Sequence, residues 1–372
     1  MVATRVILEL VLHIGTTKTG TSSIQKFLAN HDARLMEHGV LYPRAGRVHG
    51  ERVVVRHVGL TLSILPVDRS MTGFDRILGL KSREERERFR DRFLEEFDSE
   101  LRQTKARQIV ISDEALYIFL KDDQIRELKA LLDRYFDHVR VVAYVRDPAS
   151  FAESAYSQHL KMGGTKSLDE FVAALGPTLS YWTKLAAWRN AFGPDSVDLR
   201  EFSRKRLRGG DVVEDFCATF LDMDVSASAD QRVVSANRSI SPLGQALLLR
   251  INRHYAAREE RRPVFFRTYV SKRFAGKGER LSAGQLADLH GALADEIRNL
   301  SADFFDGREI FESSASAAPT ESLDDGAVAE AAVAMAAAAF VRGAKEQKKA
   351  LRKGRPAERR GRKRGLLGLI AK

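Results

Sequence analysis

The stretch that most constrains the fold lies near the N-terminus. A run of β-forming residues, Val6–Leu12, is followed by a short loop rich in Gly, Thr and Ser. Apolar residues at helical spacing come next, namely Ile24, Phe27 and Leu28. A strand, a tight loop and a helix start direct backbone N–H groups and the positive end of the helix dipole to one point. We therefore expect an anion-binding site at this loop.

The threonines and the lysine of this loop are more informative than its glycines. Gly15 and Gly20 have the spacing of the first half of a nucleotide-triphosphate P-loop, but Thr21 follows where that motif has lysine. The lysine of this loop is Lys18, between the two glycines. A glycine pair with a Ser/Thr cap is common at strand-to-helix turns. Four hydroxyl residues and a lysine within the seven positions 15–21 instead favour a bound phosphate, with the ammonium presented to a second anionic centre.

The net charge of the chain is concentrated at its C-terminus. The 372 residues carry a net charge of +11, of which residues 345–364 supply +9 and Lys372 one more. The remainder is close to neutral, so we expect no specific nucleic-acid partner. With 44% apolar residues, the chain is long enough for one large or two ordinary domains. Its single cysteine, Cys217, excludes an internal disulfide framework and fits a reducing compartment.

The sequence also bears on location. No stretch reaches the roughly 20 apolar residues needed to span a bilayer, and none reads as a secretory signal, so we expect a cytoplasmic protein. The basic run 345–364 is followed by a short apolar segment, residues 365–370. Such a tail favours peripheral contact with an anionic membrane, here the inner membrane surface. The alternative is a disordered, solubilising end.

Apolar runs alternate with helical patterns along the chain. Strand-like runs at 108–112, 139–145 and 197–202 are separated by helical spacing at 122–135 and 181–192. This alternation predicts an α/β fold with a central, mainly parallel sheet flanked by helices. Ligands of such sheets bind at the carboxyl ends of the strands. The Lys18 loop, Asp113–Glu114 and Arg146 all follow strand-like runs, so we expect them at one edge of the sheet.

Several further features organise the chain. We expect Val40–Pro43 to be a short edge strand and residues 44–81 to be a surface excursion near the loop, either part of an acceptor site or a solvated connection. Ser82 and Glu85 predict a capped helix with Phe89, Phe93 and Phe97 on its buried side. The expected organisation is a catalytic domain at 1–310, a linker at 311–326, an Ala-rich helix at 327–344, isolated or docked, and a basic tail at 345–372.

Two elements together resemble a known family. The loop resembles the 5′-phosphosulfate-binding loop of sulfotransferases that use 3′-phosphoadenylyl sulfate (PAPS). Arg146 and Ser154, at a strand end and on the next helix, resemble that family's 3′-phosphate-binding element at its usual separation. The resemblance covers residues 6–222 and is closest to bacterial carbohydrate-type members. It implies a P-loop-like sulfotransferase architecture with helical C-terminal additions. The implied reaction moves a sulfuryl group from PAPS to a hydroxyl of a saccharide or glycolipid and releases adenosine 3′,5′-bisphosphate (PAP).

The resemblance also implies roles for particular residues. Lys18 would stabilise the charge that develops on the leaving phosphate. Arg146 and Ser154 would hold the 3′-phosphate. A purely structural Arg146, paired with an acidic neighbour, is the alternative. The 5′-phosphate would lie among the residues of the loop, which are Thr17, Lys18, Thr19, Gly20, Thr21, Ser22 and Ser23.

The acceptor side has a preferred base and two other candidates. We favour Glu114 as general base, against a structural carboxylate that caps the next turn. His57 and His49 are the other candidates. Ser23 stands where cytosolic small-molecule members carry the tryptophan that stacks on adenine, so the adenine contact is left open among Trp182, Trp188 and Phe202. No metal-ligand cluster is visible in the sequence, and this chemistry requires none.

A P-loop kinase or NTPase is the alternative function. Lysine is absent after Gly20, where that class needs it. Only Asp113 ends an apolar strand in a position suited to Mg²⁺.

Overall fold

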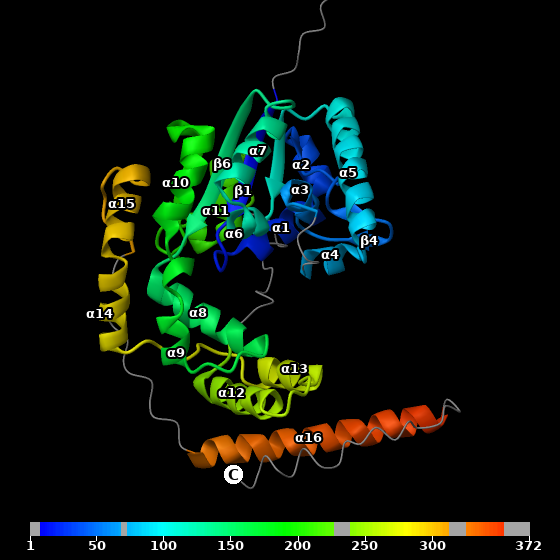
Figure 1. The fold of residues 1–372 in the computed structure, drawn as a ribbon, viewed down its shortest axis with the longest axis vertical. Coiled ribbons are helices and arrows are strands. Elements are labelled where there is room, and N and C mark those ends of the chain that lie inside the picture. Colours follow the sequence, from blue (N-terminus) through cyan, green and yellow to red (C-terminus); the bar gives the residue numbers. More distant parts are fainter. Residues whose placement is uncertain (1–7, 68–72, 227–238, 312–324, 353–372) are drawn as a thin grey trace, which may run out of the picture. The chain divides into compact units, whose positions relative to one another are not determined.

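The computed structural model describes residues 8–67, 73–226, 239–311 and 325–352 (Figure 1). The chain divides into two compact units. The first, the sheet unit, comprises Met1–Asp147, Ser180–Ser235 and Leu293–Glu312. The second, the helical unit, comprises Pro148–Leu179, Ala236–Ala292 and Ser313–Lys372.

The sheet unit is built on five parallel strands in the order β2-β5-β1-β6-β7. In chain order their bounds are β1 Glu9–Gly15, β2 Val40–Leu41, β5 Gln108–Ser112, β6 His138–Val145 and β7 Val197–Glu201. The predicted parallel sheet flanked by helices is therefore confirmed, and the short strand β2 lies at an edge. Since β5, β1 and β6 are neighbours and parallel, the segments that follow them meet at one end of the sheet.

Helices cover the sheet, and its central strands are apolar on both faces. Val11, Val110 and Val142 share a core with residues of α1 (Thr21–Asn30) and α11 (Val212–Phe220). Cys217 is fully buried in this core. The helix α10 (Tyr181–Phe192) packs against β6, β7 and α7 (Asp122–Leu132). Figure 1 shows α10 beside β6. Further helices of this unit are α2 Asp32–Glu37, α5 Arg83–Gln103, α6 Glu114–Phe119 and α15 Ala294–Phe304, with short 3₁₀ turns at Pro194–Ser196 and Arg208–Gly210.

The segment 44–81 is not simply a surface excursion, and in this respect the prediction is wrong. It contains the hairpin β3 (Val48–His49) and β4 (Arg52–Val53), α3 (Val58–Ile64) and α4 (Gly73–Leu78), and α3 is buried along its whole length. Two glycines allow α3 to be buried in this way. A Cβ on Gly59 would lie 2.4 Å from the Gly46 Cα, so the two backbone segments cross at a distance that only glycine permits.

The predicted capped helix is present as α5. The Ser82 side chain accepts a hydrogen bond from the Glu85 N–H, and Phe89, Phe93 and Phe97 are buried.

The helical unit is organised around α12 (Pro242–Ala256), which packs against α8 (Pro148–Lys161), α13 (Val264–Arg273) and α16 (Asp325–Arg352). Its remaining elements are α9 Leu168–Ala173, α14 Ala283–Ala292 and a 3₁₀ turn at Gly176–Thr178. The Ala-rich segment lies in α16, where Val328, Ala331 and Met335 are buried, so this helix docks on α12. Most of the expected linker and residues 353–372 of the tail lie outside the described residues. Among the described helices, none has the length and apolar character that crossing a bilayer requires.

Candidate functional site

The loop between β1 and α1 is fixed to the neighbouring strand β6. The Thr16 N–H and the Thr16 hydroxyl both donate to the Tyr144 carbonyl, at 3.1 and 2.9 Å. The Thr19 hydroxyl donates to the Thr16 carbonyl at 2.6 Å. Lys18 and Gly20 have left-handed backbones, with φ of 65° and 79°. The loop is therefore held in one conformation by its own hydroxyls, which is a second use for the threonines beyond contact with an anion.

Backbone donors converge at the start of α1. Within the described residues, the N–H groups of Thr19, Gly20, Thr21 and Ser22 donate to no backbone carbonyl. No side chain caps this helix, and no acidic residue lies in its first turn. The N-terminus of a ten-residue helix thus faces the loop with donors that await an acceptor, the arrangement that binds phosphate.

Gly20 is required here for two reasons. Its φ lies in the left-handed region, and a Cβ at this position would lie 2.6 Å from Val212 Cγ1. The same Cβ would lie 3.2 Å from the ring of Phe202, the first residue after β7. Any other residue would push the loop away from α11 and this ring.

Arg146 directly follows β6 and reaches the loop. Its NH1 donates to the Lys18 carbonyl at 3.1 Å, and its guanidinium carbon lies 5.7 Å from the Phe202 ring centroid. The structure therefore brings together two of the predicted anion-binding elements. Ser154 is half-buried on α8 and belongs to the helical unit, whereas Arg146 belongs to the sheet unit. Their joint role stays a prediction.

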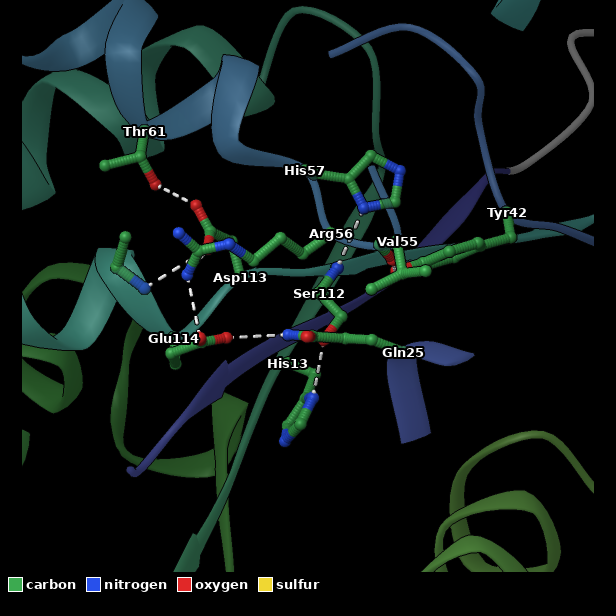
Figure 2. A network of polar contacts seen from close by, with 11 residues as sticks. His13, Gln25, Tyr42, Val55, Arg56, His57, Thr61, Ser112, Asp113 and Glu114 are labelled. Atoms are coloured by element: carbon green, nitrogen blue, oxygen red, sulfur yellow. Dashed lines mark hydrogen bonds and ion pairs between the residues drawn. The ribbon is translucent and has the colours of Figure 1, made fainter. Parts of the chain in front are cut away.

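Asp113 directly follows β5 and has a structural function (Figure 2). Its side chain is fully buried and caps α6, accepting from the Ala115 N–H at 3.2 Å. It also accepts from the Thr61 hydroxyl at 2.5 Å and lies 3.3 Å from Arg56 NH1. Burial raises its pKa to about 6. Both carboxylate oxygens are occupied, which disfavours the Mg²⁺ role that a P-loop kinase would need. In the described part of the chain, no group of three or more His, Cys, Asp or Glu side chains is arranged to hold a metal ion.

Glu114 lies next to the loop, held from two sides. Arg56 NH1 donates to its Oε1 and Gln25 Nε2 donates to its Oε2, each at 2.7 Å (Figure 2). A Cβ added to Gly15 would lie 3.3 Å from the Glu114 Cβ, so Glu114 adjoins the last residue of β1, where the loop begins. Its side chain keeps 19% exposure. Glu114 is thus oriented and accessible, and its function as a base stays a prediction.

The two histidine candidates are placed differently. His57 is fully buried; its Nδ1 accepts from the Ser112 N–H at 3.2 Å and its Nε2 contacts the Pro43 carbonyl at 2.9 Å. These contacts require a neutral ring protonated on Nε2, and burial lowers its pKa to about 3. Neither nitrogen remains to accept a proton from a substrate. His49 lies on the β3–β4 hairpin, where its Nδ1 is 2.8 Å from Arg92 NH2.

The three aromatic residues considered as adenine contacts lie in different surroundings. Trp188 is buried and stacks on Phe192, and Trp182 donates from Nε1 to Asp303 at 2.7 Å. Phe202 lies beside Gly20 and Arg146 and is the one that adjoins the loop.

Sequence reasoning assigned no role to Gln25 and Arg56. Gln25 lies one helical turn after Thr21, so its position on α1 gave a usable signal. Arg56 reaches Glu114 across 58 residues, for which the sequence holds no local pattern.

The chain resembles known proteins at low sequence identity. No family model matches the chain. An uncharacterized protein of Archaeoglobus fulgidus is 27% identical over 144 residues, which are 39% of this chain and 38% of that protein. The chain thus spans little more than a third of this relative. The crystal structure of a sulfotransferase from Alicyclobacillus acidocaldarius covers 80% of this chain and 94% of its own, with 14% identity and a TM-score of 0.40.

Proposed function

We propose that this protein is a sulfotransferase that moves a sulfuryl group from PAPS to a hydroxyl of a saccharide or glycolipid, with PAP as the second product. The observation that carries the proposal is the contact between Arg146 and the Lys18 carbonyl. This contact joins the loop after β1, whose backbone N–H groups are proposed to bind the ligand, to the guanidinium that follows the neighbouring strand β6. A nucleotide with two separate anionic groups, and no γ-phosphate, suits such a pair of sites.

Sulfuryl transfer asks a protein mainly for in-line positioning and for stabilisation of charge. In the proposed reaction, the N–H groups at the start of α1 hold the 5′-phosphate. The acceptor oxygen attacks sulfur as the bond from sulfur to the bridging oxygen breaks. Lys18 neutralises the negative charge that then develops on the leaving phosphate. Arg146, together with Ser154, takes the 3′-phosphate, and Phe202 is suited to contact the adenine.

Glu114 is proposed to take the proton of the acceptor hydroxyl. The hydrogen bonds from Arg56 and Gln25 fix the direction of its carboxylate, so that attack and proton transfer occur in one geometry. In the structure Arg56 occupies Oε1 of Glu114 and Gln25 occupies Oε2. We therefore expect the acceptor to displace or lengthen the contact between Arg56 and Glu114 when it binds.

The C-terminal region is proposed to contact an anionic membrane, consistent with a lipid-linked acceptor. In the helical unit, basic and aromatic side chains line a pocket of about 370 Å³, among them Phe265, Lys272 and Arg342. The Arg342 guanidinium lies 5.6 Å from the Phe265 ring centroid. The basic run 345–364 follows Arg342 in the sequence and adds net positive charge to this end of the chain.

Ligand-dependent stability tests the main proposal. We expect PAP to raise the melting temperature of the full chain, because a ligand at about 100 times its Kd contributes about 2.7 kcal/mol. ATP with Mg²⁺ should have no comparable effect. Arg146→Ala should lose most of the shift, whereas Arg140→Ala should keep it, since Arg140 lies on β6, the strand that precedes Arg146, but pairs with Asp198. A shift with ATP and Mg²⁺ and none with PAP would refute the proposal and favour a P-loop kinase.

A further inference from the structure

Two buried tyrosine hydroxyls near the loop have no hydrogen-bond partner. Tyr117 on α6 and Tyr181 on α10 keep only 5% and 3% exposure. Within the described residues, neither hydroxyl oxygen has a partner. A buried hydroxyl without a partner costs about 1–3 kcal/mol, and native proteins rarely leave one unsatisfied. Each therefore marks a position where a missing group is expected.

Tyr181 lies at the corner formed by the loop and Arg146. It is the first residue of α10, which packs on β6. Its hydroxyl approaches the Thr16 side chain and the Arg146 backbone without reaching hydrogen-bond geometry. Burial raises the pKa of Tyr181, and the nearby Arg146 guanidinium opposes this effect. The hydroxyl thus remains protonated and faces a region of positive charge.

Tyr117 and Lys184 lie close to Tyr181 and to each other. Tyr117 lies three residues after Glu114 on α6. Burial raises the pKa of Tyr117, and the nearby Tyr181 raises it further. The Lys184 ammonium, one turn from Tyr181 on α10, lies 5.1 Å from the Tyr117 ring centroid. Burial lowers the pKa of Lys184. Among the described residues, no carboxylate forms an ion pair with this ammonium.

The nearby carboxylate Glu296 does not supply the missing acceptor. It raises the pKa of Tyr117, but its oxygens accept from the N–H and the hydroxyl of Thr183. Two hydroxyl donors and one ammonium therefore gather beside the loop. An anion supplies acceptors for all three, and water supplies no charge to balance Lys184.

We propose that Tyr181, Tyr117 and Lys184 complete the anion site of the loop. The Tyr181 hydroxyl donates to an oxygen of the phosphate or sulfate ester bound there, and Tyr117 with Lys184 forms a second row of donors behind it. This inference rests on the proposed function and adds binding residues to the same site. It assigns the site to ligands with more anionic oxygens than the loop alone can satisfy.

The test compares Tyr181→Phe with a matched control, Tyr42→Phe, in the full chain. Tyr42 is also buried, but its hydroxyl already donates to the Val55 carbonyl at 2.7 Å. Without ligand, we expect Tyr181→Phe to be as stable as the wild type or more so, and Tyr42→Phe to be less stable. By calorimetry with PAP, Tyr181→Phe should bind about 10-fold more weakly or worse, and Tyr42→Phe should bind as the wild type does. Tyr117→Phe and Lys184→Met should weaken binding in the same direction.

Each outcome bears on one of the two proposals. If the wild type does not bind PAP, the proposed function fails and takes this inference with it. If the wild type binds and Tyr181→Phe binds equally well, only this inference is overturned. A loss of stability in Tyr181→Phe similar to that in Tyr42→Phe would show that a water already satisfies the hydroxyl, and would also overturn it.

Discussion

We expect His57 to make the folded protein sensitive to acid. The ring is neutral and fully buried, and both its nitrogens are used. Its pKa is lowered to about 3 in the folded chain, whereas an unfolded histidine has a pKa of about 6.5. Between these values only the unfolded state binds the proton. Stability is therefore complete above pH 6.5 and is lost as the pH falls toward 3. From pH 7 to pH 5, the loss from this residue is about 2 kcal/mol.

Two other buried groups also change the free energy of unfolding between pH 7 and pH 5. His13, whose pKa burial lowers to about 4, has the same sign and adds a further loss of about 2 kcal/mol over this range. Asp113 has the opposite sign, because its pKa is raised to about 6 and its folded form binds the proton first. Protonation of Asp113 therefore increases the free energy of unfolding by about 1 kcal/mol between pH 7 and pH 5. The three groups together therefore predict a net loss of about 2–3 kcal/mol.

The assay is urea unfolding of the full chain at pH 7 and pH 5, with His57→Gln beside the wild type. Glutamine keeps one acceptor and one donor but cannot take a proton in this range. The variant should be less stable at pH 7, and the difference from the wild type should shrink by about 2 kcal/mol at pH 5. Adding His13→Gln should remove most of the remaining acid dependence. If the wild type and His57→Gln lose the same free energy between the two pH values, the neutral buried ring is refuted.

Four further outcomes follow from the site. Lys18→Ala should abolish sulfuryl transfer from PAPS to an acceptor pool, scored by mass spectrometry, while PAP binding stays within a few-fold; loss of binding as well would give Lys18 a ground-state role. Arg146→Ala should raise the Kd for PAP about 10–100-fold by calorimetry, because a charge-assisted hydrogen bond is worth about 1.5–3 kcal/mol, and an unchanged Kd would contradict its contact with the ligand. Glu114→Gln should lower kcat about 100-fold or more without changing PAP affinity, and near-normal turnover would exclude it as the base. Removal of residues 353–372 should reduce co-sedimentation with anionic vesicles at low salt; binding that does not change speaks against the membrane contact.

The parts of the fold that the sequence predicts are those set by local chemistry. Strand β5 has the bounds that its apolar run gives, and the Ser82 cap and the phenylalanines of α5 depend on neighbours within one or two turns. The loop was recognisable because its residues are contiguous. Its meeting with Arg146 followed from the rule that parallel strands place their carboxyl ends together.

The parts that could not be predicted depend on distant contacts. Arg56 reaches Glu114, and Tyr181 reaches the corner beside Thr16, only through the tertiary fold. The burial of α3 depends on the crossing of Gly46 and Gly59, which a sequence shows only as two separate glycines. The pairing of His57 with Ser112 and Pro43 likewise joins three segments, so an isolated histidine in an irregular stretch gave no sign of its structural role.

The left-handed backbone of Lys18 opposes its proposed catalytic function to the stability of the fold. A lysine in this conformation is less favourable than glycine by about 1–2 kcal/mol, so the chain would gain stability by giving up its ammonium. Lys18→Gly should accordingly melt at a higher temperature than the wild type while failing to turn over. Selection for thermal robustness alone would drive this position toward glycine, and only selection for turnover would keep the lysine.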